Sequence, residues 1–154
     1  WVTQKGYVDI AELAIENGLD LSEIDEFIIN GVVRMKDLDL LKLYISKGVF
    51  IPKDIFSTAV RTGSVEMVEY LLSLGAEVKP SDLSNAMDSG YNELTELLMT
   101  KVEPNPYMLK RSIVLGRPKM VEILLQYGVR YEGDMADAIN TKNKKIINLI
   151  KQYR

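Results

Sequence analysis

The stretch GSVEMVEYLLSLG, from Gly63 to Gly75, returns in the same chain as GRPKMVEILLQYG, from Gly116 to Gly128. Four weaker copies surround these two. The six copies begin at residues 6, 36, 63, 90, 116 and 142, so the spacings are 30, 27, 27, 26 and 26. Self-similarity at such a period is typical of proteins built from stacked structural repeats. An irregular helical bundle with chance similarity is the alternative, and six aligned copies argue against it.

Each copy carries the pattern of one amphipathic helix. Apolar residues stand four, seven and eight places after the start, with charged or polar residues at the third and sixth places, as expected for one buried helical face. The fourth place holds Ile10, Leu40, Met67, Leu94, Met120 and Ile146. Four copies close on a glycine suited to a left-handed helix cap, namely Gly18, Gly48, Gly75 and Gly128.

A shorter helix is predicted before each copy. A small or β-branched residue stands four places before every start, at Val2, Val32, Ala59, Ala86, Ser112 and Ala138. Small side chains let neighbouring helices approach closely. Prolines and aspartates in the links, as in Pro80-Ser81-Asp82, suit helix starts. The first five residues look like the tail of a helix whose start is missing, so we expect a piece of a longer protein.

The segment GSVEMVEYLLSLGAEV, residues 63–78, resembles the ankyrin repeat, with Glu77 in the place of that family's aspartate. Ankyrin repeats run about 33 residues, whereas these lack several residues where the family builds its β-hairpin finger. The Thr-Pro-Leu-His opening of the family is also absent. TPR, HEAT and armadillo repeats are longer still. Trimmed repeats of this kind resemble those encoded by large DNA viruses and phages.

The resemblance implies an all-α fold, a helix–turn–helix solenoid of about six ankyrin-like repeats in a single domain. The predicted repeats cover residues 1–21, 22–52, 53–80, 81–105, 106–132 and 133–154. It also implies that a protein partner binds on the concave face of the stack and at the turns between repeats, with the chain acting as a scaffold or inhibitor. The residues at the ends of the first helices then face the partner. In this sequence those places hold Lys5, Arg34, Met35, Arg61, Thr62, Asp88, Ser89, Val114, Leu115 and Asn140.

Four of these residues have two interpretations each. Val114 and Leu115 are either apolar anchors for a partner or core residues packed beneath Tyr91 or Tyr131. Arg34 and Arg61 either pair with carboxylates of a partner or are solvated or bound within the chain.

Charge is distributed unevenly along the chain. Residues 1–26 hold one lysine and seven acids, a net charge of −6, whereas residues 142–154 hold five basic residues and no acid, a net charge of +5. The basic residues are Lys142, Lys144, Lys145, Lys151 and Arg154. Three interpretations stay open: a solubilising end cap, a patch for an acidic protein or a phosphate backbone, and head-to-tail association of two copies.

Composition narrows the function classes. The 154 residues include no cysteine and no histidine, which removes thiol chemistry, the commonest general base and the commonest zinc ligand. The spacing of Asp20, Glu23, Asp25 and Glu26 does not fit an EF-hand and indicates an exposed loop and helix start. We expect a non-enzymatic, intracellular and cytoplasmic protein-binding module with no cofactor, metal, small-molecule substrate or membrane segment. The alternative is a nucleic-acid or nucleoprotein accessory that uses the basic C-terminal repeat.

Overall fold

The computed structural model describes residues 2–133 and 135–153, with side chains from residue 7 onward. Within these ranges the regular structure is helical and no strand is formed. The chain divides into two compact units, Trp1–Glu77 and Val78–Arg154. The first unit ends in the link between the third and fourth predicted repeats.

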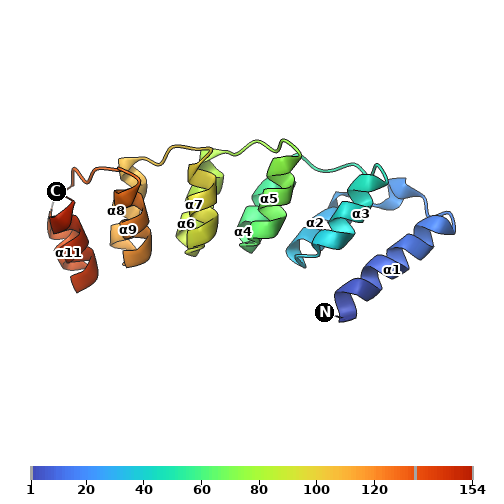
Figure 1. Ribbon diagram of the computed structural model, residues 1–154, viewed down its shortest axis with the longest axis horizontal. Coiled ribbons are helices and arrows are strands. Elements are labelled where there is room, and N and C mark those ends of the chain that lie inside the picture. The colour runs from blue at the N-terminus through green and yellow to red at the C-terminus, as the bar shows by residue number, and fades with distance from the viewer. Residues whose placement is uncertain (1, 134, 154) are drawn as a thin grey trace. The chain divides into compact units, whose positions relative to one another are not determined.

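The first unit contains a lone helix followed by two helical pairs (Figure 1). Helices α2 and α3 form one pair and α4 and α5 the next, with α1 against α3 and α2 against α4. A short 3₁₀ helix, η1, links α1 to α2. The bounds are α1 Val2–Glu16, η1 Leu21–Glu23, α2 Glu26–Arg34, α3 Leu38–Ser46, α4 Ile55–Thr62 and α5 Val65–Ser73.

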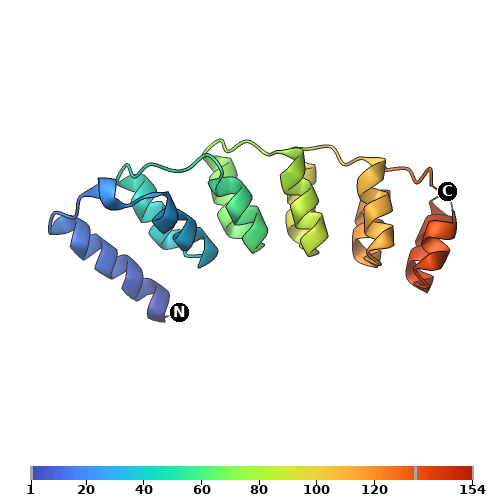
Figure 2. The ribbon, with the colours of Figure 1, turned by 180° about the vertical axis from the view of Figure 1, so that it is seen from behind.

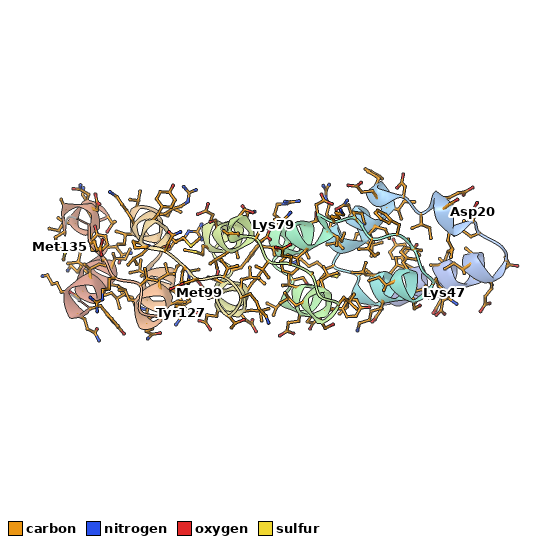
Figure 3. The ribbon with its side chains drawn as sticks, turned by 90° about the horizontal axis from the view of Figure 1, so that it is seen from above. Asp20, Lys47, Lys79, Met99, Tyr127 and Met135 are labelled. Carbon is orange, nitrogen blue, oxygen red and sulfur yellow. The ribbon has the colours of Figure 1, made fainter. Side chains whose placement is uncertain are left out.

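The second unit contains three helical pairs, α6 with α7, α8 with α9, and α10 with α11 (Figure 2). First helices pack on first helices and second helices on second helices, so α8 contacts α6 and α10, and α9 contacts α7 and α11. Figure 3, seen along the helices, shows these two rows within the unit. The bounds are α6 Pro80–Ser89, α7 Asn92–Met99, α8 Pro106–Val114, α9 Pro118–Gln126, α10 Met135–Asn140 and α11 Lys144–Gln152.

The predicted apolar columns form the cores of both units. Five of the six residues at the fourth place are at most 6% exposed, namely Leu40, Met67, Leu94, Met120 and Ile146. The small column before each start is buried too, from Val32 to Ala138. Burial of a large aliphatic side chain such as those at the fourth place contributes roughly 1.5–3 kcal/mol, so the apolar columns supply much of the stability of each pair.

The turn inside each pair depends on one left-handed residue. The residue that begins the copy has positive φ in five of six cases, at Lys36, Gly63, Gly90, Gly116 and Lys142. It ends the first helix, and the next residue caps the second. Asp37, Ser64 and Asn143 do so with side-chain oxygens that accept backbone N–H groups of the following turn. The predicted closing glycines, Gly18, Gly48, Gly75 and Gly128, also have positive φ.

The first repeat departs from the prediction. A short helix ending before Gly6 was expected, but α1 is one uninterrupted helix from Val2 to Glu16. The missing cap after Gly6 does not by itself account for this, because Tyr91 after Gly90 and Arg117 after Gly116 form no side-chain cap either. Because α1 runs on through Gly6, the described part of the chain has no separate first helix in this repeat. As a result Ile10, in the column that is buried elsewhere, is 66% exposed.

The acidic segment after α1 behaves as predicted for an exposed loop and helix start. Asp20 caps η1 by accepting the N–H of Ser22 at 2.9 Å, and Asp25 caps α2 by accepting the N–H of Ile28 at 3.0 Å. The bond from Ser22 stabilises the carboxylate of Asp20 and lowers its pKa. In the part of the chain that the structure describes, no helix is long and apolar enough to cross a lipid bilayer.

Candidate functional site: a cleft between α2 and α4

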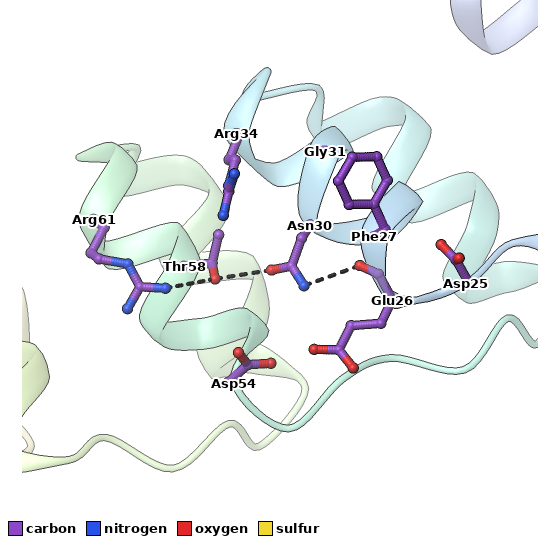
Figure 4. A pocket seen from close by; sticks show the side chains of 9 residues that line it. All are labelled: Asp25, Glu26, Phe27, Asn30, Gly31, Arg34, Asp54, Thr58 and Arg61. Atoms are coloured by element: carbon purple, nitrogen blue, oxygen red, sulfur yellow. Dashed lines mark hydrogen bonds between the residues drawn. The ribbon is translucent and has the colours of Figure 1, made fainter.

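The first unit carries an open cleft of about 570 Å³ between its two first helices, α2 and α4 (Figure 4). Two of the residues predicted to face a partner, Arg34 and Arg61, line it. The full lining is Asp25, Glu26, Phe27, Asn30, Gly31, Arg34, Asp54, Thr58 and Arg61. The size lies in the range of ordinary ligand and peptide sites.

A chain of hydrogen bonds crosses the cleft and orients Arg61. Arg61 Nη2 donates to Thr58 Oγ1 at 3.0 Å, and the Thr58 hydroxyl donates to Asn30 Oδ1 at 3.0 Å. Asn30 in turn donates its amide to the carbonyl oxygen of Glu26 at 3.0 Å. Thr58 is 3% exposed, so this network is anchored in the core at the α2–α4 contact. Among the described residues Arg61 uses one of its five donors, and the others are available to a ligand.

The cleft carries charges of both signs. Figure 4 shows Arg34 above the Asn30–Thr58 bond, Arg61 beyond Thr58 at the end of it, and the carboxylates of Glu26 and Asp54 below it. Arg34 is exposed, and among the described residues it has no hydrogen-bond or salt-bridge partner. Neither arginine forms a salt bridge with a described carboxylate, so both can bind an anionic group, since Arg pairs with carboxylates through parallel N–H donors.

The remaining lining residues were not predicted. Phe27, Asn30, Gly31 and Arg34 lie three or four places apart, so they share the face of α2 opposite the buried Ile29. Phe27 is 82% exposed, and a side chain added at Gly31 would meet no atom within 4 Å. The signal in the sequence is the helical spacing from Arg34 back to Phe27, which places these residues on one face. Selecting helix ends alone misses all of them except Arg34.

The other predicted partner-binding residues lie at the ends of their helices as expected. Met35, Val114 and Leu115 are 50%, 63% and 46% exposed. Val114 and Leu115 are therefore not core residues beneath a tyrosine. Thr62 is half-buried and donates its hydroxyl to the carbonyl of Ala59. Ser89 and Asn140 end α6 and α10 and are exposed. The side chain of Lys5 lies outside the described residues.

Asp88, another predicted partner-binding residue, is held within the second unit. Arg111 of α8 donates Nε and Nη2 to the two carboxylate oxygens of Asp88 at 2.6 and 2.7 Å. These bonds raise the pKa of Arg111. Arg117 also donates to the backbone carbonyl of Asp88. Asp88 therefore joins α6 to α8, and its carboxylate is less available to a partner than those in the α2–α4 cleft.

The predicted basic patch is partly neutralised. Lys145 lies 3.5 Å from Glu122 of α9. Lys142, Lys144 and Lys151 are exposed and have no acidic partner among the described residues. Arg154 lies outside the described residues. Only part of the positive charge inferred from the sequence is therefore free on this surface.

Metal-binding groups and titrating residues were sought throughout the described chain. No group of three or more acidic side chains there could hold a metal ion. Burial raises the pKa of Tyr44, and the nearby charge of Asp37 adds to the effect, but this tyrosine is 8% exposed and belongs to the core. No family model, curated protein or solved structure matches the chain.

Proposed function

We propose that the chain is an ankyrin-like repeat module that binds another protein without catalysing a reaction, as a scaffold or an inhibitor. In this proposal the α2–α4 cleft receives an acidic segment of the partner. The observation that carries it is the pair Arg34 and Arg61, two exposed guanidinium groups at one cleft, neither of which is bound to a carboxylate of the described residues.

Three features support binding of a polypeptide. Arg61 is oriented by a buried threonine, which lowers the entropy lost when it pairs with a ligand. Phe27 offers an exposed aromatic ring beside the arginines, and aromatic residues together with arginine dominate the energetics of protein interfaces. Gly31 has no side chain and no atom near its would-be Cβ position, so the main chain of a bound segment can approach α2 there.

The ankyrin-like assignment rests on the sequence columns and on how the helices pair. Each complete repeat is two helices joined by a left-handed residue, and within each unit neighbouring repeats pack first helix on first helix. The links between repeats are short, as the trimmed period implies. Absence of histidine and cysteine from the sequence favours binding over catalysis.

The alternative role, an accessory for nucleic acid at the C-terminal repeat, has less support. Lys145 is engaged by Glu122, and the net charge of the chain is −3. Phosphate binding draws its affinity from many basic contacts, and three free lysines supply few.

Selection from a random peptide library displayed on phage tests the proposal. Peptides enriched on the wild-type chain are expected to carry at least one Asp or Glu beside an apolar residue. Their affinity should fall about tenfold or more in Arg34→Gln/Arg61→Gln, because charge-assisted hydrogen bonds contribute roughly 1.5–3 kcal/mol.

The matched control is Lys47→Gln/Lys101→Gln, which removes the same charge at two exposed residues outside the cleft. Retained binding in the control with loss in the arginine variant supports the cleft. Peptides without acidic residues, or equal loss in both variants, would show that the cleft does not recognise an acidic segment.

A further inference from the structure

Helix α1 has an apolar face with no other element packed on it. Tyr7, Ile10 and Leu13 are 49%, 66% and 60% exposed. In the five later copies of the repeat, the residues at the same three places are buried or half-buried, and the first helix of each pair packs against the second. Three large apolar side chains exposed on one short helix form a surface of the kind that associates with another polypeptide.

Acidic side chains border this face. Asp9, Glu12 and Glu16 are exposed, and none of them has a salt bridge among the described residues. Asp9, Leu13 and Glu16 lie four and three places apart and therefore project on one side of the helix. The two acids are separated by seven residues, or about 10.5 Å along the helix axis.

Helix α11 carries the complementary arrangement. Lys144, Ile147 and Lys151 share one side of α11, and the two lysines are exposed and unpaired among the described residues. Lys144 and Lys151 are also seven residues apart, about 10.5 Å, and flank an apolar residue as the acids flank Leu13. Ile147 is only partly buried.

The chain already joins neighbouring helices of a row by contacts of this kind. In the second row, Lys145 of α11 pairs with Glu122 of α9 at 3.5 Å, and Lys42 of α3 lies 5.4 Å from the ring centre of Tyr70 of α5. In the first row, Lys110 of α8 pairs with Asp137 of α10 at 3.3 Å. Charged side chains therefore take part in contacts between adjacent repeats within each unit.

We propose that α1 of one copy binds the outer face of α11 of a second copy, with Asp9 and Glu16 opposite Lys144 and Lys151. Leu13 and Ile147 meet at the centre of this contact. A contact of α1 with α1 would instead oppose acid with acid. Because the two faces differ, the contact is heterologous, and a pair retains one unused α11 face on one copy and one unused α1 face on the other.

Sedimentation equilibrium of the 154-residue chain tests the proposal over a wide concentration range, at about 20 mM and about 500 mM salt. The wild type is expected to associate, and more strongly at low salt. Lys144→Glu/Lys151→Glu should weaken association about tenfold or more, because each reversal replaces an attraction with a repulsion. Asp9→Lys/Glu16→Lys should do the same.

Combining both reversals in one chain restores opposite charges and should restore association. The control Lys47→Glu/Lys101→Glu changes the net charge by the same amount as the α11 reversal, at exposed residues elsewhere, and should leave association unchanged. Circular dichroism checks that every variant stays helical. The proposal is overturned if the wild type is monomeric at low salt. This holds also where the monomer binds nucleic acid through the lysines. It is also overturned if association survives either reversal alone or is not restored in the combined variant.

Discussion

The left-handed residue that begins each copy gives the sharpest prediction about stability. Gly63, Gly90 and Gly116 occupy this position with positive φ, and in two repeats a lysine does, Lys36 with φ 58° and Lys142 with φ 53°. A residue with a Cβ atom pays about 1–2 kcal/mol in this conformation. Glycine avoids that cost but loses more backbone entropy on folding, about 0.5–1 kcal/mol.

The difference between these two terms predicts that Lys36→Gly stabilises the chain by about 0.5–1 kcal/mol. The lysine side chain is exposed and forms no salt bridge among the described residues, so its removal costs little. Gly116→Ala should destabilise by about 1 kcal/mol. A Cβ at Gly116 would meet no atom within 4 Å, so this cost comes from φ alone.

Urea unfolding followed by far-UV circular dichroism measures both changes. With a slope of about 1–3 kcal/mol per molar urea, a change of 1 kcal/mol moves the midpoint by about 0.3–1 M. Lys36 and Gly116 belong to different units. If the units unfold in separate transitions, each substitution should shift only one of them.

Gly31→Ala provides the control because Gly31 lies inside α2 and a Cβ there also meets nothing within 4 Å. The same chemical change should stabilise at this position by about 0.5–1 kcal/mol. Destabilisation by Lys36→Gly, or stabilisation by Gly116→Ala, would refute the assignment of left-handed turns to this column.

Two further predictions concern Tyr44 and Gly90. Burial raises the pKa of Tyr44, so the neutral form of this tyrosine stabilises the fold below about pH 10. This contribution is lost as the pH rises through the raised pKa, and the urea midpoint should therefore fall at alkaline pH. Tyr44→Phe should make that fall smaller, and an unchanged fall would contradict this prediction. Gly90→Ala should lower the free energy of unfolding by more than Gly116→Ala does. Both glycines have a positive φ, 78° at Gly90, but at Gly90 the added Cβ would also collide with the guanidinium of Arg117. Adding Arg117→Ala should remove that excess in a thermal or urea double-mutant cycle, and an excess that persists would place the strain elsewhere.

Much of the fold could be predicted because its determinants are local. The apolar columns, the small residues and the closing glycines each follow from spacing along one helix, and the buried core uses them. The first repeat could not be predicted this way. Gly6 occupies the turn column in sequence, yet α1 continues through it. A side-chain cap does not decide the outcome, because Gly90 and Gly116 form the turn although Tyr91 and Arg117 make no such cap.

Only part of the candidate site could be predicted, because part of it depends on how two helices pack and not on spacing along one helix. Arg34 and Arg61 stand at helix ends, which the family resemblance selects, whereas Phe27 and Asn30 lie a turn or two earlier on the same face. The hydrogen bond from Thr58 to Asn30 spans 28 residues. It depends on which turn of α2 faces which turn of α4, and that register is not encoded in either helix alone.

The contacts between repeats nonetheless follow a rule that the sequence could have supplied. Asp88 and Arg111 are 23 residues apart, and Glu122 and Lys145 have the same separation. Thr58 and Asn30, like Tyr127 and Met99, are 28 apart. With a period of 26 or 27 residues, these values correspond to one repeat less about one helical turn, or one repeat plus a residue or two. Once a period is known, polar partners across a repeat boundary should be sought at these separations. This converts long-range pairs that appear unpredictable into a short list of candidates.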